Sequence, residues 1–181
     1  MRLLSIVLLA LAVVAVSTGP LASAATIAVP NSSFEEGVTE DGAPRGWPER
    51  FGRAVFGDSV TVSQERAVDG RHSVKIEDRL PDAGLGVRSA RIPATPGRRY
   101  TATVQVFIEQ GNSQLYLEFW NDAGTRIYYV TTTENRTGEW HTLTASAVAP
   151  EGATAITLLL YGNIPNTGVA YFDVATLESD E

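Results

Sequence analysis

One short stretch of the sequence places side chains that can stack against a ligand and hydrogen-bond it at alternate positions. Tyr116, Glu118 and Trp120 are separated by single apolar residues, so a β-strand would turn all three to the same side. Two aromatic faces with a carboxylate between them can pack on flat apolar surfaces and accept hydroxyl hydrogens. The spacing therefore predicts a binding surface built on a strand.

The same region offers little for acid–base catalysis. Cleavage of a glycosidic bond uses two carboxyl groups about 5 to 9.5 Å apart. Only Glu118 is well placed on the predicted face, because Glu109 has outward parity but lies at the end of its strand, and His72 and His141 fall outside the face. We therefore expect no catalytic activity, and a jelly-roll glycoside hydrolase or polysaccharide lyase is the less favoured alternative.

The rest of the sequence predicts the strands that position these residues. Apolar and polar residues alternate from Tyr100 to Ile108. Turn residues at Asn121–Gly124 separate Leu115–Trp120 from Arg126–Thr133, which predicts a hairpin. This spacing of strands and turns favours an all-β, antiparallel jelly-roll β-sandwich. Further strands are expected at Val60–Ser63, His72–Glu77, Val87–Ile92, Trp140–Val148, Ala155–Tyr161 and Val169–Leu177.

Strand parity extends the predicted binding face to neighbouring strands. In Arg126–Thr133 we favour Arg126 and Tyr128 as outward residues, and a one-residue bulge would exchange Tyr128 for Tyr129. Trp47 and Trp140 lie at strand entrances, and we expect both to pack in the core. The predicted binding face comprises the stacking residues Trp120, Tyr116 and Tyr128, the hydrogen-bonding residues Gln105, Glu118 and Arg126, and also Phe107 and Tyr161.

Several short motifs follow one another in an order that resembles a known family. They are Asn31–Gly37 (NSSFEEG), Gly46-Trp47, Ala67–Lys75 (AVDGRHSVK), Thr95–Tyr100 (TPGRRY), Glu139-Trp140, Pro150–Ala153 (PEGA) and Val169–Val174 (VAYFDV). This order is similar to that of the cenC-type carbohydrate-binding modules of families four, nine, sixteen and twenty-two, and the likeness spans the mature chain. It implies a galactose-binding-like jelly roll with one flat or concave face that takes a glycan chain.

The resemblance also implies a structural Ca²⁺ ion, which many members of the family hold. It places the acid after Phe34, which is Glu35 or, after a shift of one residue, Glu36, near Asp173 in the last strand. The Asp69-Gly70 turn is a source of carbonyl oxygens. Calcium prefers such oxygen ligands. The predicted ligands are therefore Glu35, Asp173 and Gly70. The alternative interpretation is that Glu35 and Glu36 are solvated surface acids.

The first 25 residues predict export from the cell. Arg2 precedes an apolar stretch from Leu3 to Val16, and Ala22-Ser23-Ala24 supplies the small residues of a cleavage site. The apolar stretch is shorter than the roughly 20 residues of a membrane span, and a retained anchor is the alternative. We expect a secretion signal at 1–25, one sandwich domain at 26–181, and a secreted or cell-surface protein with no membrane span after cleavage.

Composition narrows the classes of partner. Fourteen Lys and Arg against 21 Asp and Glu give a formal net charge of −7, which argues against nucleic acid as a partner. The absence of cysteine excludes disulfides and thiolate metal sites. We expect a monomer that binds a polysaccharide or oligosaccharide, with a secreted glycoside hydrolase as a possible associate.

The sugar itself stays open at this point. Cellulose, xylan, β-glucan, mannan and uronic-acid polymers all fit an aromatic face, and the net acidity of the chain disfavours a polyanion. A cell-surface or matrix domain that binds another protein through the same aromatic face is the alternative function.

Overall fold

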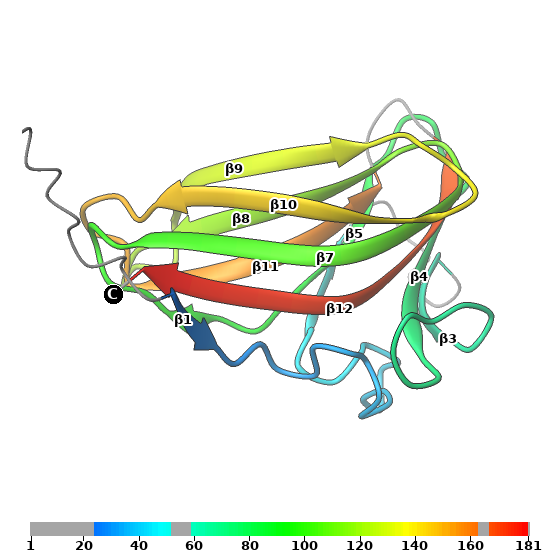
Figure 1. The fold of residues 1–181 in the computed structure, drawn as a ribbon, viewed down its shortest axis with the longest axis horizontal. Coiled ribbons are helices and arrows are strands. Elements are labelled where there is room, and N and C mark those ends of the chain that lie inside the picture. Colours follow the sequence, from blue (N-terminus) through cyan, green and yellow to red (C-terminus); the bar gives the residue numbers. More distant parts are fainter. Residues whose placement is uncertain (1–23, 52–58, 163–166, 181) are drawn as a thin grey trace, which may run out of the picture.

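The computed structural model describes residues 24–51, 59–162 and 167–180, which form two antiparallel sheets packed face to face (Figure 1). Sheet 1 contains, in spatial order, β10 (Trp140–Val148), β7 (Arg99–Gln110), β12 (Gly168–Asp180), β4 (Ser73–Asp78) and β3 (Val60–Ser63), with β1 (Ala24–Ile27) paired to β12. Sheet 2 contains β2 (Glu49–Phe51), β5 (Leu85–Arg88), β11 (Ala155–Gly162), β8 (Ser113–Trp120) and β9 (Arg126–Glu134), with β6 (Ile92–Pro93) paired to β11.

The chain changes sheet at most of its turns, as in a jelly roll. It crosses from sheet 1 to sheet 2 between β1 and β2, β4 and β5, β7 and β8, and β10 and β11. It returns between β2 and β3, β6 and β7, β9 and β10, and β11 and β12. Figure 1 shows β10, β7 and β12 in front of β8, β11 and β5. The predicted antiparallel sandwich and the β8–β9 hairpin are confirmed.

The strand boundaries differ from the prediction in a few places. The strand expected at Val87–Ile92 is two short strands, β5 and β6, and the pairings of β1 and β2 were not predicted. Of the secretion signal expected at 1–25, only Ala24 and Ala25 lie among the described residues, and they begin β1. No helix in the described ranges is long and apolar enough to cross a membrane.

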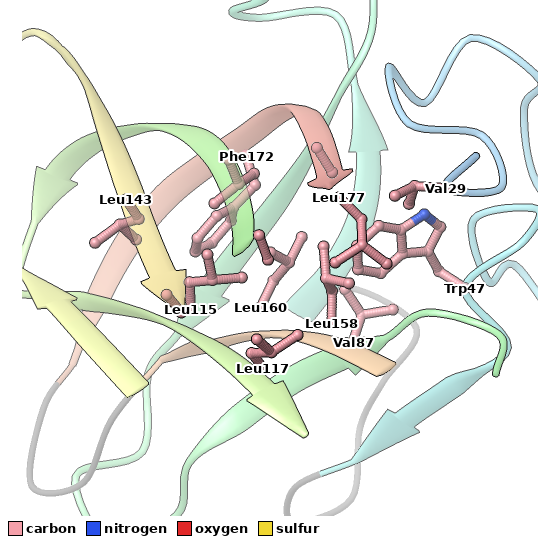
Figure 2. Packing of buried hydrophobic residues seen from close by; sticks show 14 of the residues in the cluster. Val29, Trp47, Val87, Leu115, Leu117, Leu143, Leu158, Leu160, Phe172 and Leu177 are labelled. Carbon is pink, nitrogen blue, oxygen red and sulfur yellow. The ribbon is translucent and has the colours of Figure 1, made fainter. Parts of the chain in front are cut away.

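The core lies between the two sheets and follows the alternation of the strands. On β8 the inward residues Leu115, Leu117 and Phe119 are fully buried. Figure 2 shows Leu115 and Leu117 close to Leu158 and Leu160 of β11. Removing a side chain of this size from water stabilises the fold by about 1.5 to 3 kcal/mol. The inward row therefore holds β8 firmly, and its outward row is fixed in consequence.

The two tryptophans expected in the core behave differently. Trp47 is fully buried, its ring centroid lies 5.2 Å from that of Phe34, and its Nε1 donates a hydrogen bond to the Pro30 carbonyl at 3.1 Å. Trp140 is only half-buried. It lies opposite Phe107 across the β10–β7 ladder, on the outward face of sheet 1. The core prediction is confirmed for Trp47 and wrong for Trp140, whose parity is outward.

A glycine allows the chain to pass close to Pro30 before Trp47 enters the core. Gly46 has a left-handed φ of +76°, and a Cβ at this position would lie 2.7 Å from the Pro30 Cβ. Gly97 has a similar φ of +82°, but its Cβ would meet nothing within 4 Å. Both positions therefore need a left-handed backbone, but only at Gly46 would a side chain clash with a neighbour.

We predict that Gly46→Ala destabilises the protein much more than Gly97→Ala. Each substitution forces alanine into a left-handed backbone, at a cost of about 1 to 2 kcal/mol. The clash at Pro30 adds about 1 to 3 kcal/mol at Gly46 alone. Urea unfolding of the two variants measures the difference. Equal free energies of unfolding would contradict the steric role of Gly46.

Candidate functional site

The outward side chains of sheet 2 form a continuous surface, which we call the sheet 2 face. Because β8 lies between β11 and β9, Glu118 stands opposite Thr157 on one side and Tyr129 on the other. Tyr116 stands opposite Leu159 in the same way, and Leu159 is in turn opposite Arg88 of β5. The predicted row on β8 is therefore the centre of a surface that four strands build.

A buried carboxylate holds the polar part of the sheet 2 face together. The side chain of Glu118 is fully buried. Its Oε2 accepts hydrogen bonds from Arg88 Nε at 2.6 Å and from Thr157 Oγ1 at 2.9 Å, and its Oε1 accepts one from Arg126 Nη1. Burial alone would lower the pKa of Arg88, but its bonds to Glu118 and Glu49 raise it above its usual value. The Arg88 guanidinium therefore stays charged, and hydrogen bonds hold both guanidinium groups against Glu118.

Trp120 belongs to this network. Its Nε1 donates to Thr157 Oγ1 at 2.8 Å. The guanidinium carbons of Arg91 and Arg88 lie 4.6 Å and 5.0 Å from its ring centroid, a cation–π distance. The indole is thus on the sheet 2 face as predicted, but arginines already pack against it. The Trp120 ring therefore helps to position Arg88 and Arg91, whether or not it also contacts a ligand.

Beside the arginines the sheet 2 face is hollowed and aromatic. The hollow has a volume of about 220 Å³. Tyr116 lies between two other tyrosines, with ring centroids 5.5 Å from Tyr129 and 5.7 Å from Tyr161. Burial raises the pKa of Tyr116 and Tyr161, so their phenols remain protonated hydrogen-bond donors. We call this the tyrosine hollow, and its lining residues are Arg88, Tyr116, Arg126, Tyr129, Leu159 and Tyr161.

A bulge decides which tyrosine of β9 belongs to the hollow. The register shifts between Phe119 and Trp120, so that Tyr129 pairs with Glu118 and Tyr128 pairs with the core residue Phe119. Tyr128 therefore lies on the opposite side of the strand, with its ring centroid 6.1 Å from that of Phe119. The preferred placement of Tyr128 on the binding face is wrong, and the bulged alternative with Tyr129 holds.

Gln105 and Phe107 do not join the sheet 2 face. Both lie on β7, which belongs to sheet 1, so their outward side chains point away from the tyrosine hollow. Gln105 Nε2 donates to Thr142 Oγ1 at 2.9 Å, and the Arg66 guanidinium covers the Phe107 ring at 4.1 Å. Their predicted placement is wrong because parity gives inward or outward, but not the sheet.

The sequence analysis did not predict two further residues of the site, Arg88 and Glu49, although strand parity could have identified Arg88. In Leu85–Arg88 the inward residue is Val87, so the same parity rule puts Arg88 outward beside β11. Glu49 lies on the rim of the face, where its carboxylate accepts a hydrogen bond from Arg88 Nη1. The remaining predicted residues, Tyr116, Glu118, Trp120, Arg126 and Tyr161, do come together.

The three predicted calcium ligands meet around one loop. Glu35 Oε1 accepts hydrogen bonds from the N–H groups of Arg71 and His72, both at 2.7 Å, and its Oε2 lies 2.7 Å from His72 Nδ1. The bond from His72 and these N–H groups hold the pKa of Glu35 at about 2. Gly70 has a left-handed φ of +66°, and a Cβ there would lie 2.4 Å from Glu35 Oε1, so a larger residue would displace the Glu35 side chain.

Asp173 binds the same loop from the other side. It is fully buried, its Oδ2 accepts the N–H groups of Val68 at 2.7 Å and Asp69 at 3.0 Å, and its Oδ1 accepts that of Val174. Burial raises its pKa, and these N–H bonds oppose the rise. The loop between β3 and β4 is thus clamped by two carboxylates.

This arrangement does not fit a calcium ion as folded, although the donor atoms are of the right class. Calcium needs about six to eight oxygen ligands, and all four oxygens of Glu35 and Asp173 face nitrogen donors instead. In the described part of the chain no three acidic or histidine side chains gather to hold a metal. Calcium binding stays a prediction drawn from the resemblance.

We predict that Glu118→Gln destabilises the protein by about 3 to 5 kcal/mol, because it leaves two arginines without their buried counter-charge. Glu49→Gln is the matched control. Glu49 also binds Arg88 but is half exposed, and surface pairs contribute about 1 kcal/mol or less. Chemical denaturation measures both. A loss below 1 kcal/mol for Glu118→Gln would show that the carboxylate does not organise the face.

We also predict that chelation leaves stability unchanged. Backbone N–H groups and the His72 ring already hydrogen-bond the carboxylate oxygens of the clamp, so we expect EDTA to remove nothing that holds the loop. The thermal unfolding midpoint with EDTA and with excess calcium tests this. A higher midpoint in calcium that Asp173→Asn abolishes would contradict the prediction and establish the calcium site.

Comparison with known proteins places the fold. No model of a known protein family matches the sequence, and no curated protein matches it. Solved structures do match. The enzymatically active domain of tailspike protein 4 from bacteriophage CBA120 has a TM-score of 0.65 at 13% identity, over 82% of this chain but only 21% of its own.

Two carbohydrate-binding modules match along nearly their full length. A family 16 module has a TM-score of 0.59 at 16% identity, over 82% of this chain and 97% of its own. The family 22 xylan-binding domain from Paenibacillus barcinonensis has a TM-score of 0.56 at 16% identity, over 92% and 99%. These identities show the fold alone. The chain has the β-sandwich fold of the carbohydrate-binding modules that its motif order resembles.

Proposed function

We propose that this protein is a non-catalytic carbohydrate-binding module that holds a polysaccharide against the sheet 2 face. The observation that carries the proposal is the tyrosine hollow, which is lined by three tyrosines, the apolar Leu159 and two arginines that Glu118 holds in place. The fold, shared with carbohydrate-binding modules, agrees with this function.

The chemistry of the hollow matches that of a sugar chain. Sugar rings present axial C–H groups that pack on flat aromatic faces, and their hydroxyls need polar partners between the rings. Tyr129 is 47% exposed and offers its ring to solvent. Arg126 lies 4.7 Å from that ring, and Glu118 holds its guanidinium in place. Groups fixed before binding lose little freedom when the ligand arrives.

The same geometry supports a role without catalysis. A glycosidase uses two carboxyls on either side of the bond that it cleaves. Glu118 is fully buried and paired with two arginines, and Glu49 is paired with Arg88. Glu109 lies on sheet 1, where it binds Arg66. Among the described residues, those that line the hollow include no carboxyl group.

We further propose that the protein acts outside the cell as a monomer, beside secreted enzymes that degrade polysaccharides. The signal-peptide pattern at 1–25 supports export. A module that binds the polymer and does not cut it is most useful where a secreted glycoside hydrolase works on the same material.

A pair of adjacent tyrosines gives a matched test of the proposed face. Tyr128 and Tyr129 are 46% and 47% exposed and lie on opposite sides of β9. We predict that Tyr129→Ala weakens binding about 5- to 150-fold, as expected for the loss of one stacking contact of about 1 to 3 kcal/mol. Tyr128→Ala should leave binding unchanged. Affinity electrophoresis against a panel of polysaccharides measures both.

Each outcome is decisive. Retention that depends on Tyr129 and not on Tyr128 supports the proposal. Equal losses in both variants would place binding elsewhere, and no retention on any polymer would favour a protein-binding surface. Release of reducing ends by the wild-type protein would show that it is an enzyme.

A further inference from the structure

The charged groups of the sheet 2 face are unusual for a chain with a net charge of −7. Two positively charged side chains, Arg88 and Arg126, line the tyrosine hollow, although the protein as a whole is negative. Arg91 adds a third cation at the Trp120 end of the face. Glu118 and Glu49 stand against these three arginines, so the named side chains, all within the described part of the chain, leave an excess of one positive charge.

The carboxylates of the face are not offered to a ligand. Glu118 is fully buried, and each of its oxygens accepts two hydrogen bonds from neighbouring side chains. Glu49 lies on the rim and pairs with Arg88 Nη1. The hollow therefore presents arginine donors to a ligand, and the only side-chain acceptors among its described lining residues are phenol oxygens.

Arg126 is the residue best placed to bind an anion. Within the described residues, its guanidinium makes one hydrogen bond, from Nη1 to Glu118 Oε1, and stacks on the Tyr129 ring. Its side chain is 37% exposed. A guanidinium carries five N–H donors in a planar fork that matches a carboxylate. Glu118 thus fixes one edge of the fork, and other donors remain for a ligand in the hollow.

Neutral sugars and acidic sugars make different demands on such a site. A hydroxyl both donates and accepts, so a neutral glycan needs acceptor groups as well as donors. A carboxylate only accepts, and it pairs with arginine through charge-assisted hydrogen bonds that are about twice as strong as neutral ones. The donor-rich, positively charged hollow is complementary to a carboxylate.

We infer that the ligand of the tyrosine hollow is a uronate-containing glycan, whose carboxylate binds Arg126 while its ring packs on Tyr129. This inference rests on the proposed carbohydrate-binding function and names the class of sugar. It reverses the expectation from net charge, because the local charge of the face differs in sign from that of the whole chain.

The test compares uronate polymers with chemically matched neutral ones. Alginate, polygalacturonate and glucuronoxylan are each run in affinity gels beside the same polymer with its carboxyl groups reduced to alcohols. We expect retention by at least one uronate polymer and at least tenfold weaker retention by its reduced form. Retention should also fall as salt rises from about 0.05 to 0.5 M, since charge pairing is screened.

Arginine variants locate the effect. Arg126→Gln should weaken binding to the uronate polymer about tenfold more than it weakens binding to the reduced polymer. Arg126→Lys keeps the positive charge but loses the planar guanidinium, so its affinity for the uronate polymer should lie between those of the wild type and Arg126→Gln. Arg66→Gln is the control, because Arg66 is 40% exposed, lies 4.1 Å from the Phe107 ring and pairs with Glu109. It belongs to the loop between β3 and β4, over the outward side of sheet 1. A cooperative unfolding transition well above the assay temperature confirms that each variant is folded.

The outcomes separate this inference from the function on which it rests. Equal binding to uronate and reduced polymers, without salt dependence, would overturn the inference and leave a module for neutral glycans. An Arg66→Gln effect as large as that of Arg126→Gln would also overturn it. No binding to any polymer in either form would overturn the proposed function itself.

Discussion

The buried carboxylate of Glu118 is the interaction on which the sheet 2 face depends. An ionised carboxylate without water must be paired and hydrogen-bonded. Arg88 and Arg126 approach it from the strands on either side of the central pair, and Thr157 links it to Trp120. One buried charge thus fixes side chains from β5, β8, β9 and β11 relative to one another. The tyrosines of the hollow therefore lie beside side chains that are held in place.

The two outward faces of the sandwich show what this interaction achieves. Sheet 1 also carries an outward aromatic row, in which Phe107 lies between Trp140 and Tyr171. There the loop between β3 and β4 folds over the sheet, because Asp173 binds its backbone N–H groups and Arg66 covers Phe107. On sheet 2 the arginines are drawn toward Glu118 instead, and the tyrosine hollow stays open.

Much of this could be predicted from the sequence, since alternation and turns are local signals. The strands, the hairpin and the outward row of Tyr116, Glu118 and Trp120 follow from them. Alternation cannot supply the sheet to which a strand belongs, so it groups Gln105 with the row on β8 although the two lie on different sheets. A bulge is equally invisible to it, because one extra residue near Ile127 exchanges Tyr128 for Tyr129.

The most direct test of the account is to map the bound glycan by NMR. Amide shifts would be followed while a soluble oligosaccharide of the retained polymer is titrated into the protein. The account predicts that the shifts concentrate on β8, β9 and β11, around the tyrosine hollow. Shifts concentrated on the outward side of β7 and β10 would contradict it, since they would place the ligand on sheet 1.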